Sequence, residues 1–552
     1  MNGDRAAKIF LIVFYAIFVS IALYSCFLDS SSLCLTGIRT SDDYAYVLAL
    51  FENFSRSGKN LLNMQQYGYG WIYWAPLYLL TYPFYILNCE QIFTLIPRLH
   101  SLVFSLLYCL YVYKISSLYT KNIWIRSLIT ICNPLFPIYG LHSIIFSSCP
   151  QAAFFAAASL YYLLKYETLT TKNIRKCFIL FAISLATKLS SIIMAPLIVL
   201  VIFHRYKWRF SKEKIILLLR ESVIALAAFI VLLSPGVLFS KQIRIITIRS
   251  VMYYIDMYQD VNVDIISNIK EILYTNPVLI ISIFGFIYII YKRYRAYNSS
   301  EDRWLSDSTI ILSGALIGIF YLIFTVPLTP VYVYRHSLAV LHLLFLGLIA
   351  LDYLVKGKKI LITLIFFFSL NSIFLSLYNT KSYAGLLDII NSRDEQAIQS
   401  VYKIRNVIIP LIKNKQIADR KIYFAIDSKG PVLVVTPFDK IDFYLNCIWD
   451  NLGDFSESLK KDVDIIILSK NAHGFKYRTE EEYLKSLEKL SLEKRQKRIE
   501  DFNLRKELVN SHTIYGNRFD LMYEDTYSYV FIKDTFLMDN AREHARPEEP
   551  GE

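Results

Sequence analysis

Two adjacent carboxylates, Asp42 and Asp43, lie in the stretch TSDDYAYVLALFENFSRSGKN, which begins at Thr40. They need an explanation because the chain is 55% hydrophobic and only 19% charged. An ionised carboxylate can act as a general base that takes a proton from an attacking hydroxyl group. Acids at the start of a helix also complement the helix dipole, so the pair has a structural explanation as well.

The residues that follow the acidic pair predict a helix that would position both carboxylates. Ser41 suits the N-cap, and apolar residues recur behind it with helical spacing until Gly58 ends the pattern. The apolar face would hold the acids at a membrane surface, and the dipole would keep a carboxylate ionised, as a general base requires. The apolar positions are Tyr44, Val47, Leu48, Phe51 and Phe54.

Basic groups and histidines that could complete such a site fall at the ends of apolar segments. Together they would hold an anion on Arg and Lys while a carboxylate takes up a proton. Each also has a structural explanation, because Lys and Arg extend to the membrane surface at span ends and a single His often packs with a hydrogen bond. The candidates are Arg98, His142, Lys188, Arg335 and His336.

Aromatic residues in the segment YGYGWIYWAPLY, among them Tyr69 and Trp74, could stack against a sugar ring. Tyr and Trp also gather at membrane interfaces, which is the alternative explanation. The sequence has no zinc-ligand spacing, no P-loop and no GxGxxG motif. We therefore assign no nucleotide site, no cofactor and no metal ligand, and leave a divalent metal open.

The elements that must position these residues are membrane spans. A chain of 552 residues with a mean hydropathy of +0.38 is typical of a polytopic membrane protein. Its net charge of +13 lies in short loops between apolar runs, so it orients the spans and does not indicate nucleic acid. The segments long enough to span are 8–28, 93–113, 124–141, 149–164, 177–187, 190–203, 216–239, 278–291, 309–326, 336–355 and 359–378. The middles of these spans are almost free of charge.

The basic loops decide how the spans are oriented. All of them fall on the cytoplasmic side only if the N-terminus is inside and the Pro-interrupted segment 71–87 does not cross. We expect 71–87 to lie at the outer interface, which gives about eleven spans with the C-terminus outside. The basic loops are KISSLYTKNIWIR, KYETLTTKNIRK, HRYKWRFSKEK, YKRYR and KGKK.

The predicted domains are a membrane domain over 1–378, whose extracytoplasmic loop 29–92 carries the acidic pair, and an extracytoplasmic α/β domain over 379–540. The polar end 541–552 is expected to be disordered. Within the α/β domain we predict helices at 383–412 and 479–508, strands at KIYFAI, PVLVVTPF and DVDIIILS, and a hairpin RFDLMYEDTYSYVFIK.

The order of these features resembles the GT-C class of polyprenyl-phosphate-sugar-dependent glycosyltransferases, over roughly residues 8–355. Within that class it is similar to the bacterial branch of protein O-mannosyltransferases, lipid A aminoarabinose transferases and lipopolysaccharide-core galacturonosyltransferases. Two departures are evident: Ala75 replaces the first Pro of a Pro-Pro element, and the loop after the third span lacks a second acid. The matching patterns are SDDYAYVLAL, YWAPLYLL, IPRLHSLVFSLLYCLYVYKISSLYTKN, LATKLSSIIMAPLIVL and YVYRHSLAVLHLLFLGLIAL.

The resemblance implies an inverting glycosyltransferase in a bacterial inner membrane. It would move a sugar from a polyprenyl-phosphate donor to an extracytoplasmic acceptor such as lipopolysaccharide or another surface glycan. Asp42, with Asp43 beside it, would be the base, and Arg335 with Arg98 or Lys188 would bind the donor phosphate. The acceptor or sugar contacts would be His142, Tyr69, Trp74 and His336. Protein O-glycosylation, lipid-linked glycan polymerisation or ligation, flipping of a lipid-linked glycan, and a purely structural role remain alternatives.

Overall fold

In the computed structural model, the described residues are mainly those of helices and strands. They fall into two compact units, one made mainly of the helices before residue 318 and one that carries a β-sheet. The described residues are 2–29, 69–135, 143, 146–256, 265–266, 268–269, 285, 287–292, 307–311, 313–314, 317, 403–410, 422–427, 443–448, 463–470, 480–488, 492–525 and 528–534.

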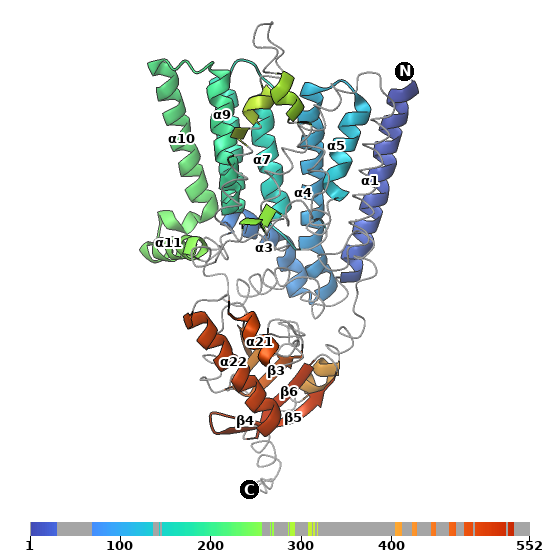
Figure 1. The fold of residues 1–552 in the computed structure, drawn as a ribbon, viewed down its shortest axis with the longest axis vertical. Coiled ribbons are helices and arrows are strands. Elements are labelled where there is room, and N and C mark those ends of the chain that lie inside the picture. Colours follow the sequence, from blue (N-terminus) through green and yellow to red (C-terminus); the bar gives the residue numbers. More distant parts are fainter. Residues whose placement is uncertain are drawn as a thin grey trace, which may run out of the picture. The chain divides into compact units, whose positions relative to one another are not determined.

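The first unit is a bundle of helices (Figure 1). Three of its described helices are long and apolar enough to cross a membrane, namely α1 over Asp4–Phe27, α4 and α10. They coincide with the predicted spans 8–28, 93–113 and 216–239. The bounds are α1 Asn2–Asp29, α3 Trp71–Ile86, α4 Glu90–Tyr119, α5 Ile123–Leu135, α7 Cys149–Leu164, α8 Thr171–Thr187, η3 Leu189–Met194, α9 Ala195–Arg205, α10 Lys212–Leu233, η4 Pro235–Leu238 and α11 Lys241–Asp256.

Helix α3 lies at one end of this bundle, opposite the end where the N-terminus lies (Figure 1). Helices α1 and α4, which precede and follow α3, pack on each other through a cluster that joins Phe18, Ala22 and Cys26 to Leu102. Helix α11 lies across the direction of α10 at the same end as α3. The segment predicted not to cross is thus a helix at the bundle end, despite Pro76 and Pro83 inside it.

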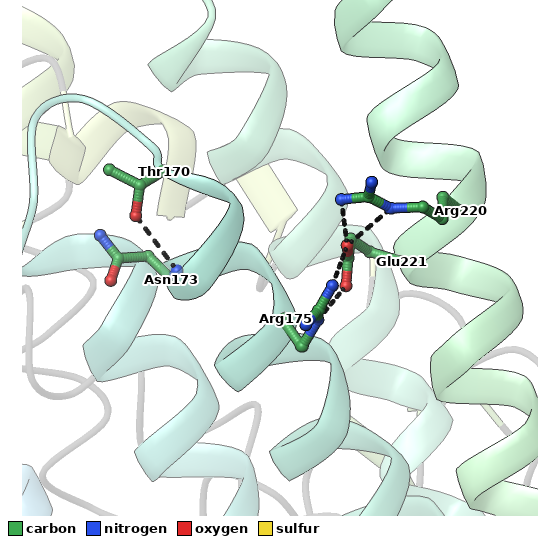
Figure 2. Close-up of polar contacts among 5 residues, drawn as sticks. All are labelled: Thr170, Asn173, Arg175, Arg220 and Glu221. Carbon is green, nitrogen blue, oxygen red and sulfur yellow. Dashed lines mark hydrogen bonds and ion pairs between the residues drawn. The ribbon is translucent and has the colours of Figure 1, made fainter.

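Side-chain caps begin α8 and α10, two of the helices that follow basic loops. The hydroxyl of Thr170 accepts a hydrogen bond from the Asn173 backbone N–H at 3.3 Å, which starts α8 (Figure 2). The hydroxyl of Ser211 accepts one from the Lys214 N–H at 3.4 Å and starts α10. Each cap satisfies a backbone donor that the helix itself leaves without a partner.

Small residues allow α7 and α8 to approach closely in the core of the bundle. Ala152, Ala156 and Ala157 on α7 are buried, and the Ser184 hydroxyl on α8 donates to the Ala152 carbonyl oxygen at 2.8 Å. Helix contacts of this kind are usual in membranes, where small side chains let backbones meet. Helix α8 also packs against α10.

The second unit contains a mixed six-stranded sheet in the order β2-β1-β3-β6-β5-β4. Strands β2, β1 and β3 are parallel, whereas β6, β5 and β4 continue the sheet antiparallel. The residues Ile465–Leu468 of β3 are all buried, so both faces of this central strand are covered. The bounds are β1 Ile422–Asp427, β2 Phe443–Ile448, β3 Ile465–Ser469, α21 Glu480–Ser486, α22 Leu492–Ser511, β4 Thr513–Ile514, β5 Asn517–Glu524 and β6 Ser528–Lys533.

Several sequence expectations for this unit need correction. The helix predicted over 479–508 is two helices, α21 and α22, with Leu487 and Glu488 forming a turn after the first. Strand β2 was not predicted. The strand expected at PVLVVTPF, most of the helix expected at 383–412 and the tail 541–552 lie outside the described residues.

Candidate functional site

Four of the predicted site residues lie in the described part of the chain: Tyr69, Trp74, Arg98 and Lys188. All four belong to the helical unit, and all four side chains are buried. The predicted base Asp42 and its neighbour Asp43, together with His142, Arg335 and His336, lie outside the described residues.

Lys188 lies at the junction where α8 ends and η3 begins. Its backbone is extended, with φ −153° and ψ 116°, and its side chain is only 3% exposed. The ammonium group lies 2.7 Å from Sγ of Cys149, the first residue of α7. It also lies 5.7 Å from the centre of the Tyr69 ring, within the range of a cation–π contact. A cation, a thiol and an aromatic ring from three separate segments therefore meet here.

Gly70 determines how closely the segment before α3 approaches Lys188. Its N–H donates to the Ala186 carbonyl oxygen at 2.8 Å, two residues before Lys188. A Cβ at this position would overlap that oxygen and lie 2.9 Å from Cα of Leu233, at the end of α10. Only glycine allows this contact, which carries Tyr69 to the ends of α8 and α10.

An aromatic cluster continues from this point along α3. The ring centres of Tyr73 and Trp74 lie 5.1 Å apart, and those of Phe146 and Trp74 lie 6.0 Å apart in an edge-on arrangement. The ring centre of His100, on α4, lies 6.0 Å from that of Tyr73. Trp74 is completely buried, so in this structure its ring packs among its neighbours; contact with a sugar stays a prediction.

Arg98 is among the largest fully buried side chains, at 2% exposure. It lies one helical turn before Ser101 on α4, so the two residues share a helix face. The Ser101 hydroxyl donates to the Ser147 carbonyl oxygen at 3.2 Å and lies 3.1 Å from the Ser147 N–H. This double contact joins the Arg98 face of α4 to the segment that leads into α7.

The segment Ser147–Cys149 thus joins the two predicted phosphate-binding cations. Ser147 bonds to the helix face that carries Arg98, and Cys149 contacts Lys188 directly. Both cations are buried at the end of the bundle where α3 lies, and there a phosphate would interact with them more strongly than in water. The arrangement is suited to stabilising negative charge on a leaving phosphate.

Residues that the sequence did not single out also belong to this region. Gln151 donates to the Ile72 carbonyl oxygen at 3.5 Å, and Cys149 and His100 make the contacts given above. The available signal was that Cys149 and Gln151 lie in the polar segment SSCPQ at the start of α7 and that His100 lies two residues after Arg98. Among the described residues no group of three His, Cys, Asp or Glu side chains could hold a metal ion.

Helix α10 carries a buried carboxylate near the start of the predicted span 216–239. Glu221 is 1% exposed and forms ion pairs with Arg175 of α8 and with Arg220. Hydropathy averaged over α10 hides this carboxylate because the residues on either side of Arg220–Ser222 are apolar.

No protein-family model matches the chain, and no protein of curated function matches it. Solved structures do. The crystal structure of ArnT from Cupriavidus metallidurans in the apo state aligns with 98% of this chain and 100% of its own, at 12% identity and a TM-score of 0.50. The structure of the same protein bound to undecaprenyl phosphate aligns with 98% of this chain and 99% of its own, at 13% identity and a TM-score of 0.51.

ArnT is a lipid A aminoarabinose transferase of the GT-C class. The structural likeness extends over nearly the whole chain. Together with the three long apolar helices, it shows that this chain is a membrane protein with the GT-C fold that the order of its sequence motifs predicted.

Proposed function

We propose that this protein is an integral-membrane inverting glycosyltransferase that uses a polyprenyl-phosphate sugar as donor. The observation that carries the proposal is the pair of buried cations, Arg98 and Lys188, which flank the segment Ser147–Cys149. The fold supports it, since a solved structure with this fold binds undecaprenyl phosphate. We expect the donor phosphate to lie near Lys188 and the lipid tail to follow the apolar helices.

The chemistry requires one base and one charged leaving group. Asp42, with Asp43 beside it, takes the proton from the acceptor hydroxyl as its oxygen attacks the anomeric carbon. The bond from that carbon to the phosphate oxygen breaks on the opposite face, and polyprenyl phosphate leaves with the electron pair. Lys188 and Arg98, with Arg335, stabilise the charge that develops on the phosphate. His142, Tyr69, Trp74 and His336 are the proposed contacts of the sugar or acceptor.

The proposed topology places the α3 end of the bundle outside the cell. Five lysines in cation–π contact with tyrosines support it, because each Lys belongs to one of the basic loops expected to be cytoplasmic. Four of these lysines lie where α4 and α7 end and where α8 and α10 begin. Aromatic and basic groups together mark a membrane interface, and basic residues favour the cytoplasmic side. The lysines are Lys114, Lys165, Lys176, Lys214 and Lys292.

It follows that the protein has about eleven spans in a bacterial inner membrane, with a cytoplasmic N-terminus and an extracytoplasmic α/β domain over 379–540. That domain would shape the acceptor side. A surface glycolipid such as lipopolysaccharide is the acceptor we favour, with a protein side chain as the alternative. A flippase of the same fold is the rival from another class, since it would move the donor without breaking the sugar–phosphate bond.

Transfer by purified protein tests the proposal. The wild type in lipid vesicles receives a panel of radiolabelled polyprenyl-phosphate sugars and a membrane extract as acceptor. We expect turnover that collapses in Asp42→Asn while donor binding is retained. Donor binding without turnover by either protein, or transport of an unchanged donor by both, would contradict a transferase. Arg209→Gln is the matched control, because Arg209 is exposed in a basic loop that η3 and α9 separate from Lys188.

A further inference from the structure

A buried carboxylate joins α8 to α10 away from the candidate site. Glu221 of α10 accepts hydrogen bonds from Nε and Nη2 of Arg175 at 2.8 and 3.0 Å (Figure 2). Nε and Nη2 of Arg220 donate to the same carboxylate at 3.1 and 2.8 Å. The Glu221 side chain is completely buried, whereas those of Arg175 and Arg220 are 47% and 56% exposed.

The cluster carries one surplus positive charge. Two guanidinium groups face one carboxylate, and each guanidinium uses two of its five N–H donors on Glu221. The remaining donors lie on side chains that are about half exposed. Because Glu221 holds both groups in place, the remaining donors are oriented in advance for a second anion.

The exposed part of the cluster lies on the surface of α10 that would contact lipid in a membrane. Only 6% of the membrane-spanning window of α10 is buried inside the protein, and Leu219 and Val223 beside Arg220 are 61% and 66% exposed. Arg220 lies about 12 Å along α10 from Lys212, by the rise of an α-helix. The Cα–Cβ bonds of an α-helix tilt toward its start and Arg side chains extend toward water, so we expect the guanidinium near the level of lipid headgroups.

We propose that Arg175 and Arg220 form a binding site for the phosphate of an anionic phospholipid, in the leaflet at the end of the bundle where α8 and α10 begin. The phosphate diester would accept the free donors of both guanidinium groups, and the acyl chains would lie along the apolar surface of α10. An anionic lipid fits because a zwitterionic headgroup leaves the surplus charge uncompensated. The site does not depend on the proposed glycosyl transfer.

Binding of an acyl-labelled phosphatidylglycerol to the purified full-length protein, in excess phosphatidylcholine, tests this site. The double variant with Arg175→Gln and Arg220→Gln removes both guanidinium groups. It should weaken binding about tenfold, because charge-assisted hydrogen bonds are lost. The matched control is Lys121→Gln with Arg209→Gln, which removes the same charge from exposed positions at the same end and should change binding less than twofold. Equal losses in both double variants would overturn the proposal.

Glu221→Gln distinguishes an oriented site from diffuse attraction. This substitution makes the cluster more positive but removes the carboxylate that orients the two guanidinium groups, so we expect weaker binding. Tighter binding would overturn the proposal. If the double variant does not fold, Arg220→Lys is the alternative, because it keeps the charge but loses the planar guanidinium group. This variant should bind the lipid several-fold more weakly. Unchanged binding by Arg220→Lys would count against the site. Displacement of the labelled lipid by glycerol phosphate at equal concentration would show a free-phosphate site instead.

Discussion

The backbone N–H of Gly70 donates to the carbonyl oxygen of Ala186 at 2.8 Å, which joins the start of α3 to the end of α8. The contact leaves no room for a side chain, because a Cβ on Gly70 would overlap that oxygen and lie 2.9 Å from Cα of Leu233. Backbone atoms cannot move aside as the end of a flexible side chain can. The position of Tyr69 beside Lys188 therefore depends on the absence of a side chain at residue 70.

Gly70→Ala should lower the thermal stability of the detergent-solubilised protein and displace Tyr69 from Lys188. We expect a loss of about 3 kcal/mol, at the upper end of what overpacking costs, and reduced donor binding. Fluorescence-detected size exclusion after heating measures the first effect. Gly516→Ala is the comparison: its φ of +78° makes alanine strained, but nothing lies within 4 Å, so the loss should be about 1–2 kcal/mol. If Gly70→Ala were as stable as the wild type, Gly70 could not lie as close to Ala186 and Leu233 as described.

Lys188 should contribute to donor binding through its charge. Lys188→Met removes the ammonium group and should weaken binding of a polyprenyl phosphate by about tenfold to a hundredfold, the range for hydrogen bonds to charged groups. Lys188→Arg keeps the charge and should retain most of the affinity. Binding of a labelled polyprenyl phosphate in nanodiscs measures the difference. If Lys188→Met bound as well as wild type while folding normally, Lys188 would be a packing residue only.

Asp307 predicts how stability depends on pH. Its carboxylate accepts a hydrogen bond from Nη2 of Arg205 at 2.8 Å and one from the Tyr119 hydroxyl at 3.2 Å, and Nε2 of His204 lies 3.3 Å away. Burial raises the pKa of Asp307, but the hydrogen bonds and charges of His204 and Arg205 outweigh it, so the pKa is lowered. A lowered pKa stabilises the fold above the ordinary value, and this stabilisation is lost as the pH falls through the lowered one.

The apparent melting temperature of the wild type should therefore be steady near neutral pH and fall below about pH 4. Asp307→Asn cannot lose a charge there, so its acid-induced fall should be smaller. At neutral pH it should be less stable by about 3 kcal/mol, because Arg205, whose side chain is only 5% exposed, would lose its carboxylate. A parallel pH profile for the two proteins would show that another group controls the acid transition.

The proposed topology predicts the outcome of fusions at the two ends of the bundle. Green fluorescent protein fused after Lys121 or Arg209 should fluoresce, because both sites lie in loops expected to be cytoplasmic. Alkaline phosphatase fused after Ser240, between η4 and α11, should be active, since this junction lies at the α3 end. Exchanging the two reporters at each site is the control. The reverse pattern would require 71–87 to cross the membrane.

The sequence by itself determined the features that depend on composition and on neighbours along the chain. Hydropathy was sufficient to locate α1, α4 and α10, because a span must satisfy its own backbone and cover itself with apolar side chains. Alternation and β-branched residues located β1, β3, β5 and β6. Arg98 and Lys188 could be named because a charge at the end of an apolar run is conspicuous.

Only the tertiary structure decided which of these residues meet. Lys188 and Cys149 lie 39 positions apart, and Arg175 and Glu221 lie 46 apart, so no periodic pattern relates either pair. Within α10, Glu221 pairs with its neighbour Arg220, and only the packing of α8 places Arg175 against it as well. Likewise, the close approach of Gly70 to α8 and α10 depends on where three helix ends converge. Local sequence sets how each segment folds, whereas packing between segments sets which charges are buried together and so where an anion can bind.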